Sequence, residues 1–106
     1  MEIKTKKELE EIINANSVVV VRFHAPWCGP CRILDSVFKE LENENTEEIK
    51  FVGIDIEEAE EKLPEELNVS NLPTIFYYKN GLVVDKTVGA IPKKNIIEKI
   101  NEVKNR

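Results

Sequence analysis

The sequence predicts an α/β fold: one domain, residues 1–106, in which a central mixed β-sheet is flanked by helices on both faces. Hydrophobic patterns with helical and strand periods alternate along the chain, which is typical of strands joined by helices. One run, Val18 to Phe23, is β-branched and lacks polar alternation, as in a strand covered on both faces. With 106 residues, of which 42% are apolar, the chain has material for one hydrophobic core and too little length for two.

The first half of the chain carries signals for a helix, a strand and a second helix. Thr5 and Glu8 have the spacing of a capping box, and the apolar residues that follow at helical intervals predict a helix over residues 6–14. The β-branched run then forms a strand over 18–23. Apolar residues at helical spacing resume at Cys31, so a second helix begins at or just before that residue and continues to the polar stretch that starts at Asn43.

The middle of the chain predicts one more strand that is followed by helical turns. The strand covers residues 49–56, and the acidic segment 57–68 forms helical turns that are broken near Pro64. Strands that are separated by helices usually pair in parallel. We therefore expect this strand to run parallel to the first.

The last part of the chain predicts a hairpin and a closing helix. Strands over 74–78 and 82–84 flank Asn80-Gly81, which supplies the positive φ angles of a tight turn, so these two strands are antiparallel. Pro92 opens the final helix. That helix carries one apolar stripe, made of Ile96, Ile97, Ile100 and Val103.

Composition and charge exclude several classes of function. Fifteen basic against twenty acidic side chains give a net charge of −5, which repels nucleic acid. The longest aliphatic run, Val18 to Val21, is far shorter than the roughly 20 apolar residues of a membrane helix. The first residues are charged and lack the apolar segment of a secretory signal. We expect a cytoplasmic monomer that binds neither nucleic acid nor membrane.

Both cysteines of the chain, Cys28 and Cys31, are separated by two residues, and three interpretations are open. A structural disulfide would close a loop so short that it removes little entropy from the unfolded chain. A metal site needs about four donors, and only His24 adds a nitrogen nearby. The third interpretation is a redox pair that opens and closes.

The position of the pair between a strand and a helix favours redox chemistry. A thiol attacks as its thiolate, and the unpaired N–H groups and dipole of a helix N-terminus stabilise that anion. We therefore expect Cys28 to be the exposed nucleophile and Cys31, one turn further in, to be the buried resolving thiol. Pro30 holds the first turn helical between them.

Four separated motifs resemble the thioredoxin family over essentially the whole chain. They are APWCGPC at 25–31, NLPT at 71–74, YKNG at 78–81 and VGA at 88–90. The resemblance implies the thioredoxin fold and a protein-disulfide reductase that needs no metal or organic cofactor. Its partners would be disulfide-containing proteins and a thioredoxin reductase linked to NADPH or ferredoxin.

The resemblance also assigns roles around the cysteines. Cys28 would attack the target disulfide and Cys31 would resolve the mixed disulfide, with Gly29 and Pro30 between them. The Leu72–Pro73 bond would be cis, and its backbone would pair with an extended target segment; without the resemblance, Pro73 simply starts a strand. The expected target surface contains Trp27, Leu72, Pro73, Thr74, Gly89 and Ala90.

The chain departs from the family in the charged residues behind the cysteines. The family commonly has a buried Asp where this chain has Arg22, and a Lys where it has Phe51. An arginine cannot accept a proton, and it is costly to bury unpaired. We hypothesise that Arg22 pairs with Asp35, one helical turn after Cys31, and that Asp35 is the proton acceptor. The alternative is that Arg22 extends to solvent and Asp35 is an ordinary surface carboxylate.

Some alternatives remain open at this stage. His24 lies four residues before Cys28 and, if close, its cation would favour the thiolate, although such a histidine is more often a packed or solvated polar residue. The fold could serve as a binding module without turnover, or as an oxidase or isomerase of an oxidising compartment. Gly29-Pro30 resembles the reducing branch of the family.

Overall fold

The computed structural model describes residues 1–45 and 49–106. Its elements in chain order are β1 (Glu2–Ile3), α1 (Lys6–Ala15), β2 (Val18–His24), α2 (Gly29–Glu44), β3 (Ile49–Asp55), α3 (Leu63–Glu66), β4 (Thr74–Lys79), β5 (Leu82–Val88) and α4 (Lys93–Lys104). The predicted capping box is present, because the Thr5 side chain accepts the Glu8 N–H and the Glu8 carboxylate accepts the Thr5 N–H.

One mixed sheet with strand order β1-β3-β2-β4-β5 forms the centre of the molecule. β1, β3 and β2 are parallel neighbours, whereas β4 is antiparallel to both β2 and β5. Asn80 and Gly81 both have positive φ at the β4–β5 turn, as this tight hairpin requires. The predicted fold class is confirmed.

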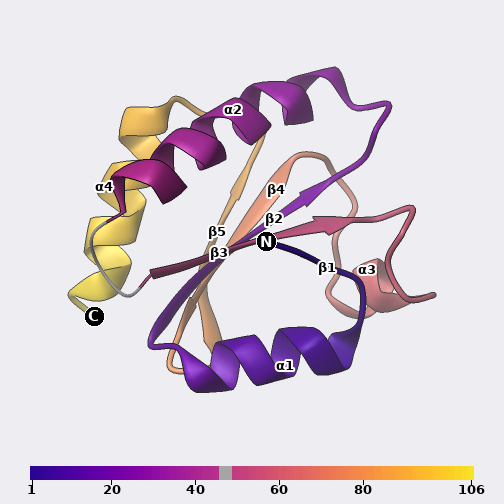
Figure 1. The fold of residues 1–106 in the computed structure, drawn as a ribbon, viewed down its shortest axis with the longest axis horizontal. Helices are drawn as coiled ribbons and strands as arrows, with labels where there is room; N and C mark the ends of the chain where they lie inside the picture. The colour runs from indigo at the N-terminus through magenta and orange to yellow at the C-terminus, as the bar shows by residue number, and fades with distance from the viewer. Residues whose placement is uncertain (46–48) are drawn as a thin grey trace.

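Helices cover both faces of the sheet, with α2 and α4 on one side and α1 and α3 on the other (Figure 1). Val18 and Val20 of β2 face the first pair of helices, and Val19 and Val21 face the side of α1. None of these four valines is more than 5% exposed. The prediction of a strand that is buried on both faces is therefore confirmed, and the strand leads directly into the cysteine segment.

Three details differ from the sequence prediction. β1 was missed, because a strand of two residues has no period that a pattern can show. Pro64 does not break a helix but lies in the first turn of α3, where its missing N–H costs nothing, and residues 57–62 form turns. β5 continues to Val88, four residues beyond the prediction, because its register with β4 persists past a bulge at Tyr77 and Tyr78.

Candidate active site

The two cysteines lie at the N-terminus of α2 and are joined by a disulfide bond. Cys28 is the N-cap residue, Pro30 occupies the first turn, and the Cys28 Sγ accepts the N–H of Cys31 at 3.3 Å. The Cα atoms of Cys28 and Cys31 are 5.3 Å apart, within the usual range for a disulfide. An N-cap sulfur that already accepts a helix amide is well placed to carry a negative charge once the bond opens.

The expectation that Cys28 is exposed is wrong for this disulfide form. Cys28 is only 6% exposed and Cys31 2%. Both pack against Ala25, Ile56 and Leu72, because the N-cap geometry turns the Cys28 sulfur back over the helix start and not outward. The difference between the two residues is access, since Cys28 lines a surface hollow and Cys31 does not.

That hollow has a volume of about 270 Å³ and connects the cysteine segment with the loop before β4. Its walls are mainly apolar, with two small polar side chains at the loop. The lining residues are Trp27, Cys28, Ile56, Val69, Ser70, Asn71 and Leu72. Trp27 itself is 67% exposed, so an apolar side chain stands uncovered next to the reactive sulfur.

Two loops that are distant in sequence meet beside this hollow. The Leu72–Pro73 peptide bond is cis, as the resemblance implied. The N–H of Gly89 donates to the Pro73 carbonyl at 2.8 Å, and Gly89 has a φ of +93°, which a residue with a Cβ rarely adopts. The expectation that Thr74 lies on the target surface is wrong for its side chain. Thr74 is 5% exposed, and its Oγ1 donates to the Asn71 carbonyl at 2.6 Å, so it holds the loop from inside.

Arg22 and Asp35 are in contact, through Arg22 Nη1 and Asp35 Oδ1. The Arg22 side chain is only 14% exposed, so it does not extend freely to solvent. Its Cζ also lies 5.6 Å from the centre of the Phe38 ring, and that ring packs edge-on against Phe51. The two departures from the family, Arg22 and Phe51, thus meet on the same phenylalanine.

Sequence reasoning missed a further residue of this cluster, Glu2. Its Oε2 accepts from Arg22 Nη2 at 3.1 Å and its Oε1 lies 2.8 Å from His24 Nε2. Burial raises the pKa of Glu2, but the hydrogen bond from His24 and the positive charges around it outweigh that effect, so the pKa lies below its usual value. His24 therefore has a definite partner on β1, which no local pattern could have indicated.

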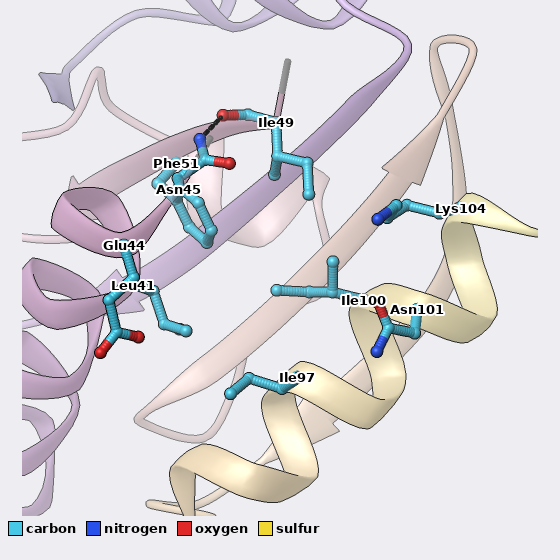
Figure 2. Close-up of a pocket in the computed structure, with 9 residues that line it drawn as sticks. All are labelled: Leu41, Glu44, Asn45, Ile49, Phe51, Ile97, Ile100, Asn101 and Lys104. Atoms are coloured by element: carbon cyan, nitrogen blue, oxygen red, sulfur yellow. Dashed lines mark hydrogen bonds between the residues drawn. The ribbon is translucent and has the colours of Figure 1, made fainter. Parts of the chain in front are cut away.

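A second hollow, of about 200 Å³, lies between the end of α2, the start of β3 and α4 (Figure 2). It is at the other end of the sheet from the cysteines, because Ile49 begins β3 and pairs with Val18 at the start of β2. Figure 2 shows the Asn45 amide donating to the Ile49 carbonyl at its rim. No residue of the expected site lines this second hollow.

Two kinds of feature are absent from the described residues. In residues 1–45 and 49–106, no helix combines the length and the apolar character needed to cross a bilayer. The same part of the chain holds no cluster of three or more His, Cys, Asp or Glu side chains with the placement of metal ligands.

The fold and the cysteine pair together define a thiol–disulfide oxidoreductase: a disulfide at a helix N-terminus, next to a cis-proline loop and an exposed tryptophan. Comparison with known proteins gives the same class. The thioredoxin family model matches residues 1–102. The chain is 36% identical over 96 residues to thioredoxin of Mycoplasmoides gallisepticum, covering 91% of this chain and 94% of that one. It is 38% identical over 88 residues to thioredoxin of Bacillus subtilis, covering 83% and 84%.

Solved structures give the same result. A Plasmodium falciparum thioredoxin superposes with a TM-score of 0.85 at 31% identity, covering 95% of this chain and 96% of that one. A reduced thioredoxin pre-protein of Schistosoma mansoni gives 0.83 at 34% identity, covering 96% and 95%. The chain belongs to the thioredoxin family and is a dithiol–disulfide redox carrier.

Proposed function

We propose that this redox carrier is a general protein-disulfide reductase in which Cys28 is the nucleophile and Cys31 the resolving thiol. The Cys28 thiolate attacks one sulfur of a target disulfide, and the other target sulfur leaves as a thiolate that takes up a proton. Cys31 then loses its proton and attacks Cys28 Sγ. The bond between Cys28 and the target breaks, the second target sulfur leaves, and two electrons have passed to the target.

The observation that carries these roles is the contrast between the two sulfurs. The Cys28 sulfur accepts a backbone N–H at the start of α2 and lines the 270 Å³ hollow. Cys31 is 2% exposed and lies in the first turn of α2, one helical turn after Cys28. A target disulfide can therefore approach Cys28 through the hollow, whereas Cys31 is reached by a sulfur that is already attached to Cys28.

The proposed target surface contains Trp27, Leu72 and the two residues Gly89 and Ala90. The sequence suggested that the main chain of a target segment pairs with Pro73. In this proposal it pairs with Leu72. Pro73 has no N–H, and its carbonyl already accepts from Gly89. The N–H and carbonyl of Leu72 would pair with an extended target segment in the manner of an added strand.

Asp35 is the proposed acceptor of the Cys31 proton. It follows Cys31 by four residues on α2, and it is turned toward the sheet by its contact with Arg22. Substituting Asp35→Asn removes the acceptor and retains the shape. The resolving step should then slow, and an unchanged Cys31 titration in this variant would exclude Asp35 from that role.

Trapping of the mixed disulfide tests the two cysteine roles directly. A Cys31→Ser variant should accumulate a covalent adduct with a disulfide target such as insulin, because nothing resolves it. The matched Cys28→Ser variant should form none. Adducts on Cys28→Ser and none on Cys31→Ser would show that the roles are reversed.

Turnover and redox poise test the reaction class. Wild-type protein should accelerate insulin reduction by dithiothreitol and Cys28→Ser should not; no acceleration by either would favour a binding module. Equilibration with defined glutathione ratios should show a reducing pair, since Gly29-Pro30 lies between the cysteines. A strongly oxidising pair would instead favour an oxidase or isomerase.

The remaining partners are part of the same proposal. We propose that a thioredoxin reductase, linked to NADPH or ferredoxin, re-reduces the protein, that it works as a cytoplasmic monomer, and that no metal or organic cofactor takes part. The net charge of −5 disfavours nucleic-acid partners. Stopped-flow reduction by each reductase class tests the electron donor. Metal analysis of the purified protein tests the lack of a metal, and its mass in solution tests the monomer.

A further inference from the structure

Four charged or polar side chains from three elements form one connected network behind the redox pair. Asp35 of α2 contacts Arg22 of β2, Arg22 contacts Glu2 of β1 at 3.1 Å, and Glu2 lies 2.8 Å from His24 of β2. Arg22 is therefore held between two carboxylates. With His24 neutral the network holds two negative charges and one positive charge, so it carries a net charge of −1.

This network adjoins the buried sulfur. Residues four apart on a helix are neighbours, with Cβ atoms about 5–6 Å apart, so Asp35 lies next to Cys31. Cys31 is 2% exposed, and the Asp35 side chain, although 39% exposed, reaches Arg22 on the sheet. Charges at a partly buried site act on each other with less screening than charges in water.

We propose that Glu2 is a positioning residue that keeps Cys31 protonated in the reduced protein, by drawing the Arg22 charge toward β1 and supplying a second negative charge. The inference rests on the proposed function, in which Cys31 must stay a thiol until Cys28 has attacked. A Cys31 thiol leaves Cys28 as the one thiolate of the pair. Without Glu2, the Arg22 charge would be compensated by Asp35 alone, the network would be neutral, and Cys31 would ionise more readily than it does with Glu2 present.

The N-terminal ammonium also acts on Glu2 and helps to lower its pKa. Two other charged groups on these elements have contacts outside the network. Arg32 of α2 is exposed and donates to the Pro26 carbonyl at 3.3 Å. Asp55 of β3 lies opposite His24 in the sheet and accepts the Glu57 N–H at 2.9 Å. A positively charged His24 would add one charge to the network, so wild type and variants are compared at the same pH values.

Gly53 provides a way to displace the Glu2 carboxylate without changing its charge. Gly53 pairs with Glu2 across β1 and β3, and a Cβ at Gly53 would lie 2.8 Å from the Glu2 Cδ and overlap its Oε2. The colliding atoms are the end of a flexible side chain, so the carboxylate moves and the backbone stays. We therefore expect Gly53→Ala to fold and to remove Glu2 from Arg22 and His24.

The experiment is a site-resolved titration of the reduced protein. Cysteine labelled with ¹³C at Cβ gives separate resonances for Cys28 and Cys31, and both are followed from pH 7 to 11 because two close thiols titrate as a coupled pair. The variants are Glu2→Gln, Gly53→Ala, the two combined, and Arg22→Gln. Glu10→Gln, an exposed residue of α1 on the other face of the sheet, makes the same charge change as a control.

The proposal predicts the direction in which each variant shifts the titration midpoint of Cys31. The Cys31 midpoint should fall by on the order of half a pH unit in Glu2→Gln, fall by less in Gly53→Ala, and rise in Arg22→Gln. Gly53→Ala should add nothing to Glu2→Gln, and Glu10→Gln should have no effect. A Cys31 midpoint that is unchanged in Glu2→Gln, or that moves in the same direction as in Arg22→Gln, overturns the proposal. Insulin reduction by the wild type is measured separately, because its failure would refute the proposed function and leave the titration valid.

Discussion

Reduction of the Cys28–Cys31 bond should leave the protein folded and lower its free energy of unfolding by about 2 kcal/mol. The bond joins residues with a sequence separation of 3, so the loop that it closes is very short. For a loop of about four residues the chain-entropy relation gives about 6 cal/mol/K, which is about 2 kcal/mol at 25 °C. A bond that must open in every cycle cannot be one on which folding depends.

The rest of the fold has enough buried apolar surface to remain intact. The two main core clusters on either side of the sheet contain neither cysteine. Each fully buried large side chain in them, such as Phe23 or Leu34, contributes about 1.5–3 kcal/mol relative to exposure. Loss of the disulfide therefore removes a small part of the total.

The assay is guanidinium unfolding of oxidised and dithiothreitol-reduced protein, followed by circular dichroism. A double variant, Cys28→Ser with Cys31→Ser, is the control, and dithiothreitol should not change its midpoint. Loss of more than about 5 kcal/mol, or an unfolded reduced state, would mean that the bond is a structural staple and would refute this reasoning.

Three further predictions concern other parts of the chain. Trp27→Ala should lower kcat/KM for a protein disulfide at least about tenfold, since covering even half of an exposed Trp is worth more than 1.4 kcal/mol; Leu82→Ala, 70% exposed at the far end of β5, should not. Burial raises the pKa of Tyr78 to about 12, so the folded state holds this proton more tightly and the free energy of unfolding should fall by about 2 kcal/mol as pH rises from 10 to 12. Urea unfolding across that range should show a smaller fall in Tyr78→Phe. Thr5→Ala breaks the capping box and should lower the free energy of unfolding by about 1 kcal/mol. Lys7→Ala on the same helix is the control and should cause no comparable loss.

Most of the fold could be predicted because its signals are local. The capping box, the β-branched run and the Asn80-Gly81 turn each specify a conformation within a few residues, and burial of an apolar stripe orients each helix. β1 gave no such signal. Its two residues form a strand only because β3 offers an unpaired edge, where the Gly53 N–H donates to the Met1 carbonyl at 2.8 Å. Strand pairing between distant segments has no signature in either segment alone.

The same distinction applies to the site. The cysteine spacing and the proline loop were recognisable as motifs, and Arg22 with Asp35 could be paired because a helical turn and a missing counter-ion limited the choice. The burial of Cys28 was mispredicted, since it depends on packing against Ile56 and Leu72 from two other loops. Glu2 was missed because its position depends on the β1–β3 register and on the absence of a side chain at Gly53.

The surroundings of Arg22 explain how a permanent cation is accommodated where an acid is usual in the family. An unpaired charge at 14% exposure would be costly. Here one guanidinium nitrogen contacts Asp35, a second contacts Glu2, and the Phe38 ring lies against the group. The two carboxylates come from different elements, Asp35 from α2 and Glu2 from β1, so the guanidinium is held from two sides. The arrangement therefore compensates a buried charge and, in the proposal above, also makes Cys31 harder to ionise, because Glu2 leaves the network with a net negative charge.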